Sequence, residues 1–258
     1  MPEHTNYLDK KSFFDRVLTV YGRKPVLETL QDTTLVCHAV HLAHSNREAG
    51  IVSEIRLRAQ KLGVPVKYHS REELARISKN GKQDQGVAVD VMCPSFRSLE
   101  DYLAEITAEP RRLLALDGIN NPQNLGMIIR SAAAGKIDGI ILPRKGNAAL
   151  GPLVIKASAG TLYRAPLLLC QSLPEALRLC QERDAHICTL DAGAALSLFD
   201  YKEQGFCVYV LGNETEGVCA QVRALADTQL SIPMRNGVES LNVAVTASLI
   251  AFASYLDR

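Results

Sequence analysis

The chain has 258 residues, of which 47% are hydrophobic and 22% are charged, and its formal net charge is +1 at pH 7. These values are typical of a globular protein with two compact domains and exclude a low-complexity chain. The near-neutral charge does not by itself indicate a nucleic-acid-binding protein, although it permits a local basic patch.

The seven cysteines form no C-x-x-C pair, and most lie in apolar runs. They indicate small buried side chains in a reducing compartment, not disulfides or zinc ligands. The sequence begins without a signal-peptide pattern, and polar residues interrupt its longest apolar stretch, 241–256. We therefore expect a cytoplasmic protein with no membrane segment and no metal site.

The first part of the chain alternates helical and extended patterns. Apolar residues at helical spacing predict a helix around Phe14, Val17, Leu18 and Tyr21, and a second short helix follows Pro25. Further helices are expected over 48–62, ending at Gly63, and from a capping box at Ser70 and Glu73 to Ile77. Strands are expected over 34–40, 64–68 and 86–92. This order predicts a small α/β sandwich.

From residue 112 onward, strands and helices alternate regularly. Near-continuous apolar strands between helices predict a parallel sheet covered on both faces. The expected strands are 113–116, 139–142, 165–169, 185–190, 206–211 and 228–232, and the expected helices are 125–134, 150–158, 174–183 and one starting near Ser240. We accordingly divide the chain into a first domain over 1–95, a linker over 96–111 and a second domain over 112–258.

Three polar loops follow predicted strands of the second domain, where open parallel sheets bind ligands. In the first loop, Asn124 is expected near a helix start, Gly126 permits a close approach by a backbone or ligand, and Arg130 follows one to two turns later. By itself, this segment also fits an Asn-capped helix with an exposed arginine.

The second loop, 211–218, has two glycines but no lysine after the second, so it is not a Walker A motif. No G-x-G-x-x-G occurs, which argues against a nicotinamide-dependent dehydrogenase. The loop also fits a surface turn with Glu214 and Glu216 at a helix start. In the third loop, Ser240 and Asn242 precede an apolar helix, and Ser240 alone fits a simple N-cap.

Together, the three loops resemble the signatures of the SpoU/TrmH family of RNA ribose methyltransferases. The matching residues are Asn124-x-Gly126-x-x-x-Arg130, Leu211-Gly-Asn-Glu-x-x-Gly217, and Ile232-Pro-Met with Ser240-Leu-Asn242. The resemblance implies a trefoil-knotted parallel-sheet domain that binds S-adenosylmethionine and forms a homodimer with its active site at the interface. It also implies transfer of a methyl group to a ribose 2′-hydroxyl of RNA.

The resemblance implies roles for two groups of residues in the second domain. The site would be organised by Asn124, Arg130, Glu214, Ser240 and Asn242. The cofactor would be contacted by Thr189, Leu211, Gly212, Asn213, Gly217, Ile232, Met234 and Leu241. Arg130 matches an arginine often proposed to activate the hydroxyl, but a guanidinium stays protonated in proteins. We therefore favour a phosphate clamp that also stabilises the developing alkoxide, and a role as a base stays open.

The first domain resembles the L30e-like substrate-binding domain of some family members, through Tyr21-Gly-Arg-Lys-Pro and Gln85-Gly-Val-Ala-Val. It departs from that pattern at Asp84, where a histidine commonly stands. The basic residues around the two turns predict RNA contacts by Arg23, Lys24, Arg76, Lys79 and Lys82. Any one of them could instead be a solvated surface charge.

This domain order is closest to the methyltransferases that modify a guanosine of 23S ribosomal RNA. We therefore expect large-subunit ribosomal RNA as the substrate, with transfer RNA as the alternative. A non-catalytic RNA-binding relative would be expected to lack Arg130 or the Ser240 and Asn242 pair, and all three are present. The spacing of His38, His41 and His44 suggests a metal site only weakly, because they lie in or after a predicted strand.

Overall fold

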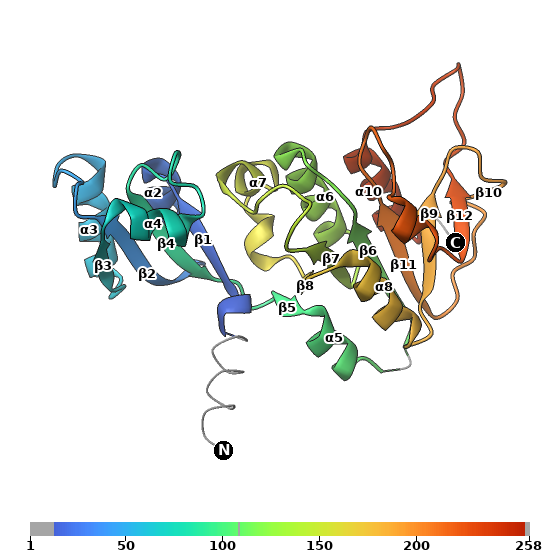
Figure 1. Ribbon diagram of the computed structural model, residues 1–258, viewed down its shortest axis with the longest axis horizontal. Helices are drawn as coiled ribbons and strands as arrows, with labels where there is room; N and C mark the ends of the chain where they lie inside the picture. The colour runs from blue at the N-terminus through green and yellow to red at the C-terminus, as the bar shows by residue number, and fades with distance from the viewer. Residues whose placement is uncertain (1–12, 108, 256–258) are drawn as a thin grey trace. The chain divides into compact units, whose positions relative to one another are not determined.

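The computed structural model describes residues 13–107 and 109–255, which fall into two compact units (Figure 1). The first unit contains the chain up to Pro94 together with Leu150–Pro152. The second contains Ser95–Ala149 and the chain from Leu153 onward. In the described residues, no helix is long and apolar enough to span a membrane.

The first unit is built on a four-stranded sheet with the order β1-β4-β2-β3. Strand β4 is antiparallel to both β1 and β2, and β3 is parallel to β2. Its elements are β1 (Val17–Tyr21), α2 (Arg23–Gln31), β2 (Val36–Ala43), α3 (Ile51–Lys61), β3 (Val66–His69), α4 (Arg71–Ser78) and β4 (Val87–Met92). The predicted capping box opens α4: the Ser70 hydroxyl accepts from the Glu73 amide at 3.2 Å, and the Glu73 carboxylate accepts from the Ser70 amide at 2.8 Å.

The helix predicted around Phe14 to Tyr21 is wrong, because Val17–Tyr21 forms strand β1. Leu18 and Val20 are buried and alternate with half-buried neighbours, which is the two-residue period of a strand. Spacings of three and four among so few apolar residues also fit a short strand that is apolar on both faces. The β-branched and aromatic content of the segment was the stronger signal.

A hydrogen-bonded chain of polar side chains crosses all four strands of this sheet. The Thr19 hydroxyl donates to Asp90 at 2.7 Å, Asp90 contacts His41 Nε2 at 3.1 Å, and His41 Nδ1 lies 2.9 Å from His69 Nε2. Burial raises the pKa of Asp90, but the hydrogen bonds from His41 and Thr19 outweigh it and hold that pKa below its ordinary value. The buried His41 is therefore part of the sheet's structure.

The second unit contains an eight-stranded sheet with the order β10-β12-β9-β11-β6-β7-β8-β5, and every neighbouring pair is parallel. Its strands are β5 (Arg97–Ser98), β6 (Arg111–Leu116), β7 (Gly139–Pro143), β8 (Leu167–Cys170), β9 (His186–Leu190), β10 (Leu196–Ser197), β11 (Phe206–Leu211) and β12 (Thr228–Ser231). Its helices are α5 (Leu99–Glu105), α6 (Pro122–Ala134), α7 (Pro152–Ala157), η1 (Thr161–Arg164), α8 (Leu173–Gln181), α9 (Ala220–Arg223) and α10 (Val243–Ala253).

Helices cover both faces of this sheet, as predicted (Figure 1). Leu113 and Ala115 of β6 belong to one core cluster with residues of α5 and α8. Because side chains alternate along a strand, Leu114 and Leu116 point to the opposite face, and both are fully buried. The α/β fold class is confirmed, whereas the trefoil knot and the L30e-like relationship stay predictions.

The segment 96–111, expected to be a linker, contains β5 and α5. Strand β5 pairs with β8, and Leu99 and Leu103 of α5 are buried in the core of the second unit. Ser98 is the N-cap of α5 and accepts from the Asp101 amide at 3.0 Å.

Gly126 sits where α6 lies against the backbone of α7. A Cβ atom at this position would lie 2.5 Å from the Ala157 Cβ and 2.7 Å from the Val154 carbonyl oxygen. The close approach expected at Gly126 is therefore made by another helix. This contact fixes the position of the helix that carries Asn124 and Arg130.

Candidate active site

The polar loops of the second unit gather at the carboxyl edge of its parallel sheet. Strands β6 and β11 are adjacent, and the chain runs from β6 to β7 on one side and later to β9 beyond β11 on the other. This arrangement is a topological switch point, where open α/β sheets leave a crevice for ligands. The loops that follow β6 and β11 lie at that point.

The loop after β11 is held by short-range hydrogen bonds. Asn213 and Gly217 exchange backbone hydrogen bonds at 3.0 and 2.9 Å, and the Asn213 side chain accepts from the Thr215 amide at 2.8 Å. Gly212 is needed because an added Cβ would lie 2.2 Å from the Gly217 carbonyl carbon. The tight turn places Glu214 at its tip.

The loops after β6 and β11 are also tied to each other. The Asn213 side chain donates to the Gly118 carbonyl at 2.8 Å, and the Asp117 carboxylate accepts from the Cys219 amide at 2.7 Å. Asn147 fixes the β6 loop from the other side by accepting from the Ile119 amide at 2.7 Å. Asp117 and Asn147 were not among the predicted site residues. The sequence indicated these two residues only through their positions, since both lie shortly after buried strands.

Asn124 links the three sequence motifs in space. It is buried, its amide donates to the Glu214 carboxylate, and its carbonyl oxygen accepts from the Asn242 amide at 3.1 Å. These residues are 90 and 118 positions apart from Asn124 in the sequence. We call Asn124, Glu214 and Asn242 the amide–carboxylate network.

Two helix starts differ from the prediction. The N-cap of α6 is Asn121, whose side chain accepts from the Gln123 amide at 2.8 Å, so the buried Asn124 is not a cap. The N-cap of α10 is Asn242, which accepts from the Ala244 amide at 2.8 Å, so Ser240 lies before the helix. Asn242 thus both caps α10 and joins the amide–carboxylate network.

Arg130 is exposed and is not part of the network. Six residues along an α-helix correspond to about 600°, which places Arg130 about 120° around α6 from Asn124. Arg130 therefore lies apart from the amide–carboxylate network, although it belongs to the same sequence motif as Asn124.

A cavity of about 160 Å³ lies beside the network, between the ends of β9 and β12 and the loop before α10. Four predicted residues line it: Ile232, Met234, Ser240 and Leu241. Asp191, Glu239 and Thr246 line it as well and were not predicted. Leu211, the last residue of β11, does not line this cavity, and neither do Gly212, Asn213 and Gly217 of the loop that follows β11.

Thr189 is buried in β9, one residue before Leu190 of the cavity wall. Its hydroxyl has no hydrogen-bond partner within the described residues. A buried hydroxyl without a partner is unusual in a folded protein, which makes Thr189 a candidate for contact with a ligand or an ordered water. Within residues 13–107 and 109–255, no group of three His, Cys, Asp or Glu side chains could hold a metal ion.

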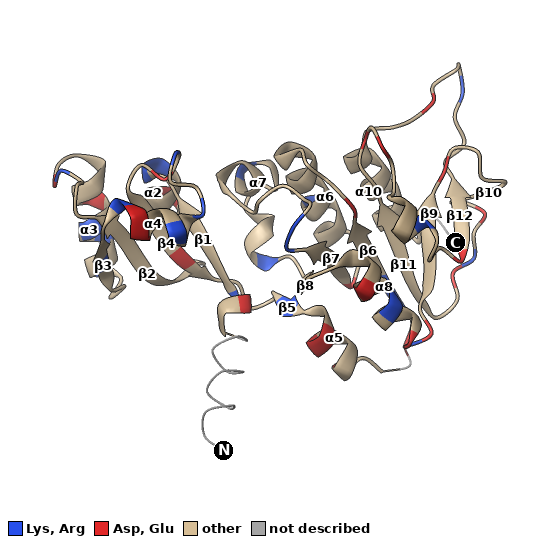
Figure 2. Cartoon of the chain, in the orientation of Figure 1, with Lys and Arg blue, Asp and Glu red and all other residues tan. Residues whose placement is uncertain are grey.

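The predicted RNA-contacting residues lie in the first unit on α2, α4 and the loop after α4. Arg23 is half-buried and donates to Asn46 at 3.1 Å, while Lys24 is exposed beside Glu28 at 4.0 Å. The others, Arg76, Lys79 and Lys82, are exposed. Figure 2 shows positions of Lys and Arg on α2, α3 and α4 interspersed along the chain with positions of Asp and Glu.

Two family models match the chain. Residues 111–252 match the SpoU rRNA methylase family, and residues 19–95 match a model described as RNA 2′-O ribose methyltransferase substrate binding. An uncharacterized tRNA/rRNA methyltransferase of Mycobacterium ulcerans is 32% identical over 92% of this chain and 76% of its own length. A relative of the same description from Mycobacterium leprae is 33% identical over the same shares.

The chain belongs to the SpoU methyltransferase family. Members of this family transfer a methyl group from S-adenosylmethionine, so the chain is an S-adenosylmethionine-dependent RNA methyltransferase.

Solved structures agree on the fold. The SpoU methyltransferase AviRb of Streptomyces viridochromogenes, in complex with AdoMet, has a TM-score of 0.63 at 20% identity and covers 94% of this chain and 91% of its own. An AdoMet-bound rRNA methyltransferase of Sinorhizobium meliloti has a TM-score of 0.64 at 19% identity, and the match covers 94% of this chain and 88% of its own.

Proposed function

We propose that the protein methylates a ribose 2′-hydroxyl of large-subunit ribosomal RNA. The observation that carries the methyl-transfer site is the amide–carboxylate network, because it joins all three family motifs at one edge of the sheet beside the cavity. The match of residues 111–252 to the SpoU rRNA methylase family favours ribosomal RNA as the substrate. The match of residues 19–95 to a substrate-binding model for RNA 2′-O ribose methyltransferases supports the 2′-oxygen as the acceptor.

The residues around the cavity fit S-adenosylmethionine. Apolar side chains of Ile232, Met234 and Leu241 line the cavity and suit its adenine and methionine carbons. The Thr189 hydroxyl, which has no partner within the described residues, would supply a polar contact next to the cavity wall. The β11 loop, with Leu211, Gly212, Asn213 and Gly217, would close the site from the other side. When bound, the cofactor supplies an electrophilic methyl group on a sulfonium.

The chain's own residues would position and activate the RNA. Glu214 is fixed through Asn124, and its carboxylate can accept a hydrogen bond from a ribose hydroxyl. Ser240, at the cavity rim, would orient the acceptor ribose. Arg130 would bind an adjacent phosphate and stabilise negative charge developing on the 2′-oxygen. Much of the rate would come from holding the reacting atoms in line.

The active site would be completed by a homodimer formed through the second unit. One side of α10 and the loop before it expose large apolar side chains: Leu241 is 37% exposed, Val245 48% and Phe252 41%. Val245 and Phe252 are seven residues apart and so lie on the same side of α10, and an exposed apolar helix side suits association with another protein surface. A second copy seated there would explain why Arg130 lies away from its own network, and sedimentation of the protein in solution tests the dimer.

Labelled S-adenosylmethionine tests the proposed function directly. The protein is incubated with the tritiated cofactor and either large-subunit ribosomal RNA or total tRNA, and the labelled nucleotide is mapped. We expect label at a ribose 2′-oxygen of the ribosomal RNA. Label only in tRNA would overturn the substrate but keep the chemistry. No label in either RNA, despite cofactor binding, would contradict the assignment and favour a non-catalytic RNA-binding relative.

Thr189→Val should weaken cofactor binding without lowering stability. Valine keeps the shape of threonine and removes a hydroxyl that has no partner in the described residues, so the free energy of unfolding should stay equal or rise by up to about 1 kcal/mol. Loss of one hydrogen bond to the cofactor should raise its Kd by about 2- to 12-fold. Calorimetric titration and thermal unfolding measure the two effects.

Thr29→Val is the matched control, because the Thr29 hydroxyl donates to the Pro25 carbonyl at 2.8 Å in the first unit. It should lower stability by about 1 kcal/mol and leave cofactor binding unchanged. Unchanged cofactor binding by Thr189→Val would remove Thr189 from the site.

A further inference from the structure

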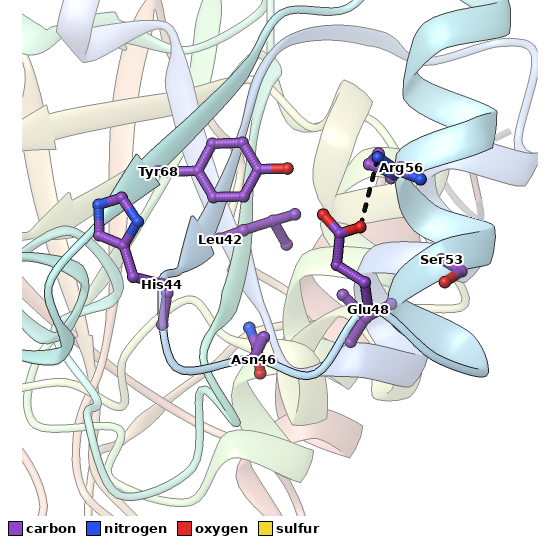
Figure 3. Close-up of a pocket in the computed structure, with 9 residues that line it drawn as sticks. Leu42, His44, Asn46, Glu48, Ser53, Arg56 and Tyr68 are labelled. Atoms are coloured by element: carbon purple, nitrogen blue, oxygen red, sulfur yellow. Dashed lines mark ion pairs between the residues drawn. The ribbon is translucent and has the colours of Figure 1, made fainter.

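The first unit contains a second cavity, of about 120 Å³, that the methyl-transfer site does not use (Figure 3). It is formed by the end of β2, the loop that follows, α3 and β3. Its apolar part includes Leu42 and Val52, which are 2% and 4% exposed. Figure 3 shows the Tyr68 ring beside Leu42, with its hydroxyl end toward Glu48 and Arg56.

Tyr68 provides a flat aromatic wall. It is 45% exposed, and its ring lies nearly parallel to that of His44, with 5.8 Å between centroids and 24° between planes. An exposed aromatic ring over an apolar floor suits a planar ligand, because bases splayed out of RNA stack on such side chains.

The rim presents both hydrogen-bond donors and acceptors. Glu48 and Arg56 form an ion pair at 3.5 Å with side chains 58% and 45% exposed, and Asn46 and Ser53 complete the polar lining. Nucleobase edges also combine donors and acceptors. A carboxylate at the rim disfavours a phosphate inside the cavity, so the interior suits a base better than an anion.

Arginines are anchored to the same loop, where an RNA backbone would run. Arg23 donates to Asn46 at 3.1 Å, and Asn46 in turn donates to the Gly86 carbonyl at 2.5 Å. Arg71 donates to the Ser45 hydroxyl at 3.1 Å. The cavity is thus linked through Asn46 to Arg23, one of the residues expected to contact RNA from the sequence.

We propose that this cavity binds one unpaired nucleobase of the RNA substrate, stacked on Tyr68 and flanked by phosphates held by Arg23 and Arg71. The inference rests on the proposed function, since it assumes an RNA substrate. It makes the first unit a reader of single-stranded or bulged RNA, because a base within a duplex cannot enter the cavity.

Filter binding of the full-length protein to a large-subunit ribosomal RNA transcript tests the cavity. Tyr68→Ala should raise Kd by about 5- to 150-fold, the range expected for the loss of one base–aromatic stack. Tyr68→Phe keeps the ring and should stay close to wild type. Ser53→Phe, which fills the cavity without removing Tyr68, should weaken binding as Tyr68→Ala does.

Leu57→Ala is the matched control, because Leu57 is 53% exposed on α3 and does not line the cavity. It should leave Kd unchanged. Wild-type affinity in both Tyr68→Ala and Ser53→Phe would overturn the inference. Cofactor binding and methyl transfer, measured on the same samples, distinguish failure of this inference from failure of the proposed function. If the wild-type protein methylates RNA and Tyr68→Ala binds RNA normally, only the base site is refuted.

Discussion

Arg130→Ala should lower kcat for methyl transfer to RNA by about 10²- to 10³-fold, which is the effect of removing one preorganised donor from a developing negative charge. The side chain is exposed on α6, so its loss should change the free energy of unfolding by less than about 0.5 kcal/mol. Cofactor binding should be unchanged, because Arg130 does not line the cavity beside the network. Single-turnover kinetics with saturating cofactor and RNA measure the effect.

Arg130→Lys separates a phosphate clamp from a simple positive charge. Lysine keeps the charge but lacks the planar fork that binds two phosphate oxygens, so this variant should also stay strongly impaired. Near-wild-type turnover by Arg130→Lys would exclude the clamp. The matched control is Arg178→Ala, which removes another exposed helical arginine of the second unit and should leave kcat unchanged.

The sequence predicted most of the second unit because its fold depends on local patterns. The strand containing Val208 and Val210 is apolar throughout and is therefore recognisable as a buried parallel strand. Motifs placed after such strands must meet at one sheet edge, and the contacts among Asn124, Glu214 and Asn242 are an instance of that rule.

What the sequence did not predict depends on where side chains point in three dimensions. Leu18 and Val20 fit either a helix or a strand, and only pairing with β4 decides between them. Tyr68 and Glu48 are distant in sequence and share a cavity only because β3 lies beside β2. Arg112 offered no signal, because nothing in its neighbourhood along the chain indicates that it is buried.

The largest change in the free energy of unfolding is expected when Arg112 is substituted. It is 8% exposed at the start of β6, and its guanidinium forms an ion pair with Glu203 at 2.7 Å. It also donates to the Ile250 carbonyl and the Ser254 hydroxyl, both at 2.9 Å, which ties the end of α10 to the sheet. The guanidinium carbon lies 5.6 Å from the centroid of the Tyr209 ring.

Arg112→Met should lower the free energy of unfolding by about 3–5 kcal/mol, because removal of one partner leaves Glu203 poorly compensated. The hydroxyl of Tyr209 already donates to Glu203, and burial together with this carboxylate raises the pKa of Tyr209. That single hydrogen bond cannot replace the cation. Chemical denaturation with two independent probes measures the change.

Two further variants test whether burial of the Arg112–Glu203 ion pair causes the expected loss of stability. Arg97 and Glu105 also form an ion pair at 2.7 Å, but their side chains are 29% and 69% exposed, compared with 10% and 26% for Arg112 and Glu203. Arg97→Met should therefore cost only about 1 kcal/mol. Adding Glu203→Met to Arg112→Met should recover part of the lost stability, because the uncompensated carboxylate is gone. If Arg112→Met and Arg97→Met cost the same, burial of the Arg112–Glu203 ion pair would not be the cause of the lost stability.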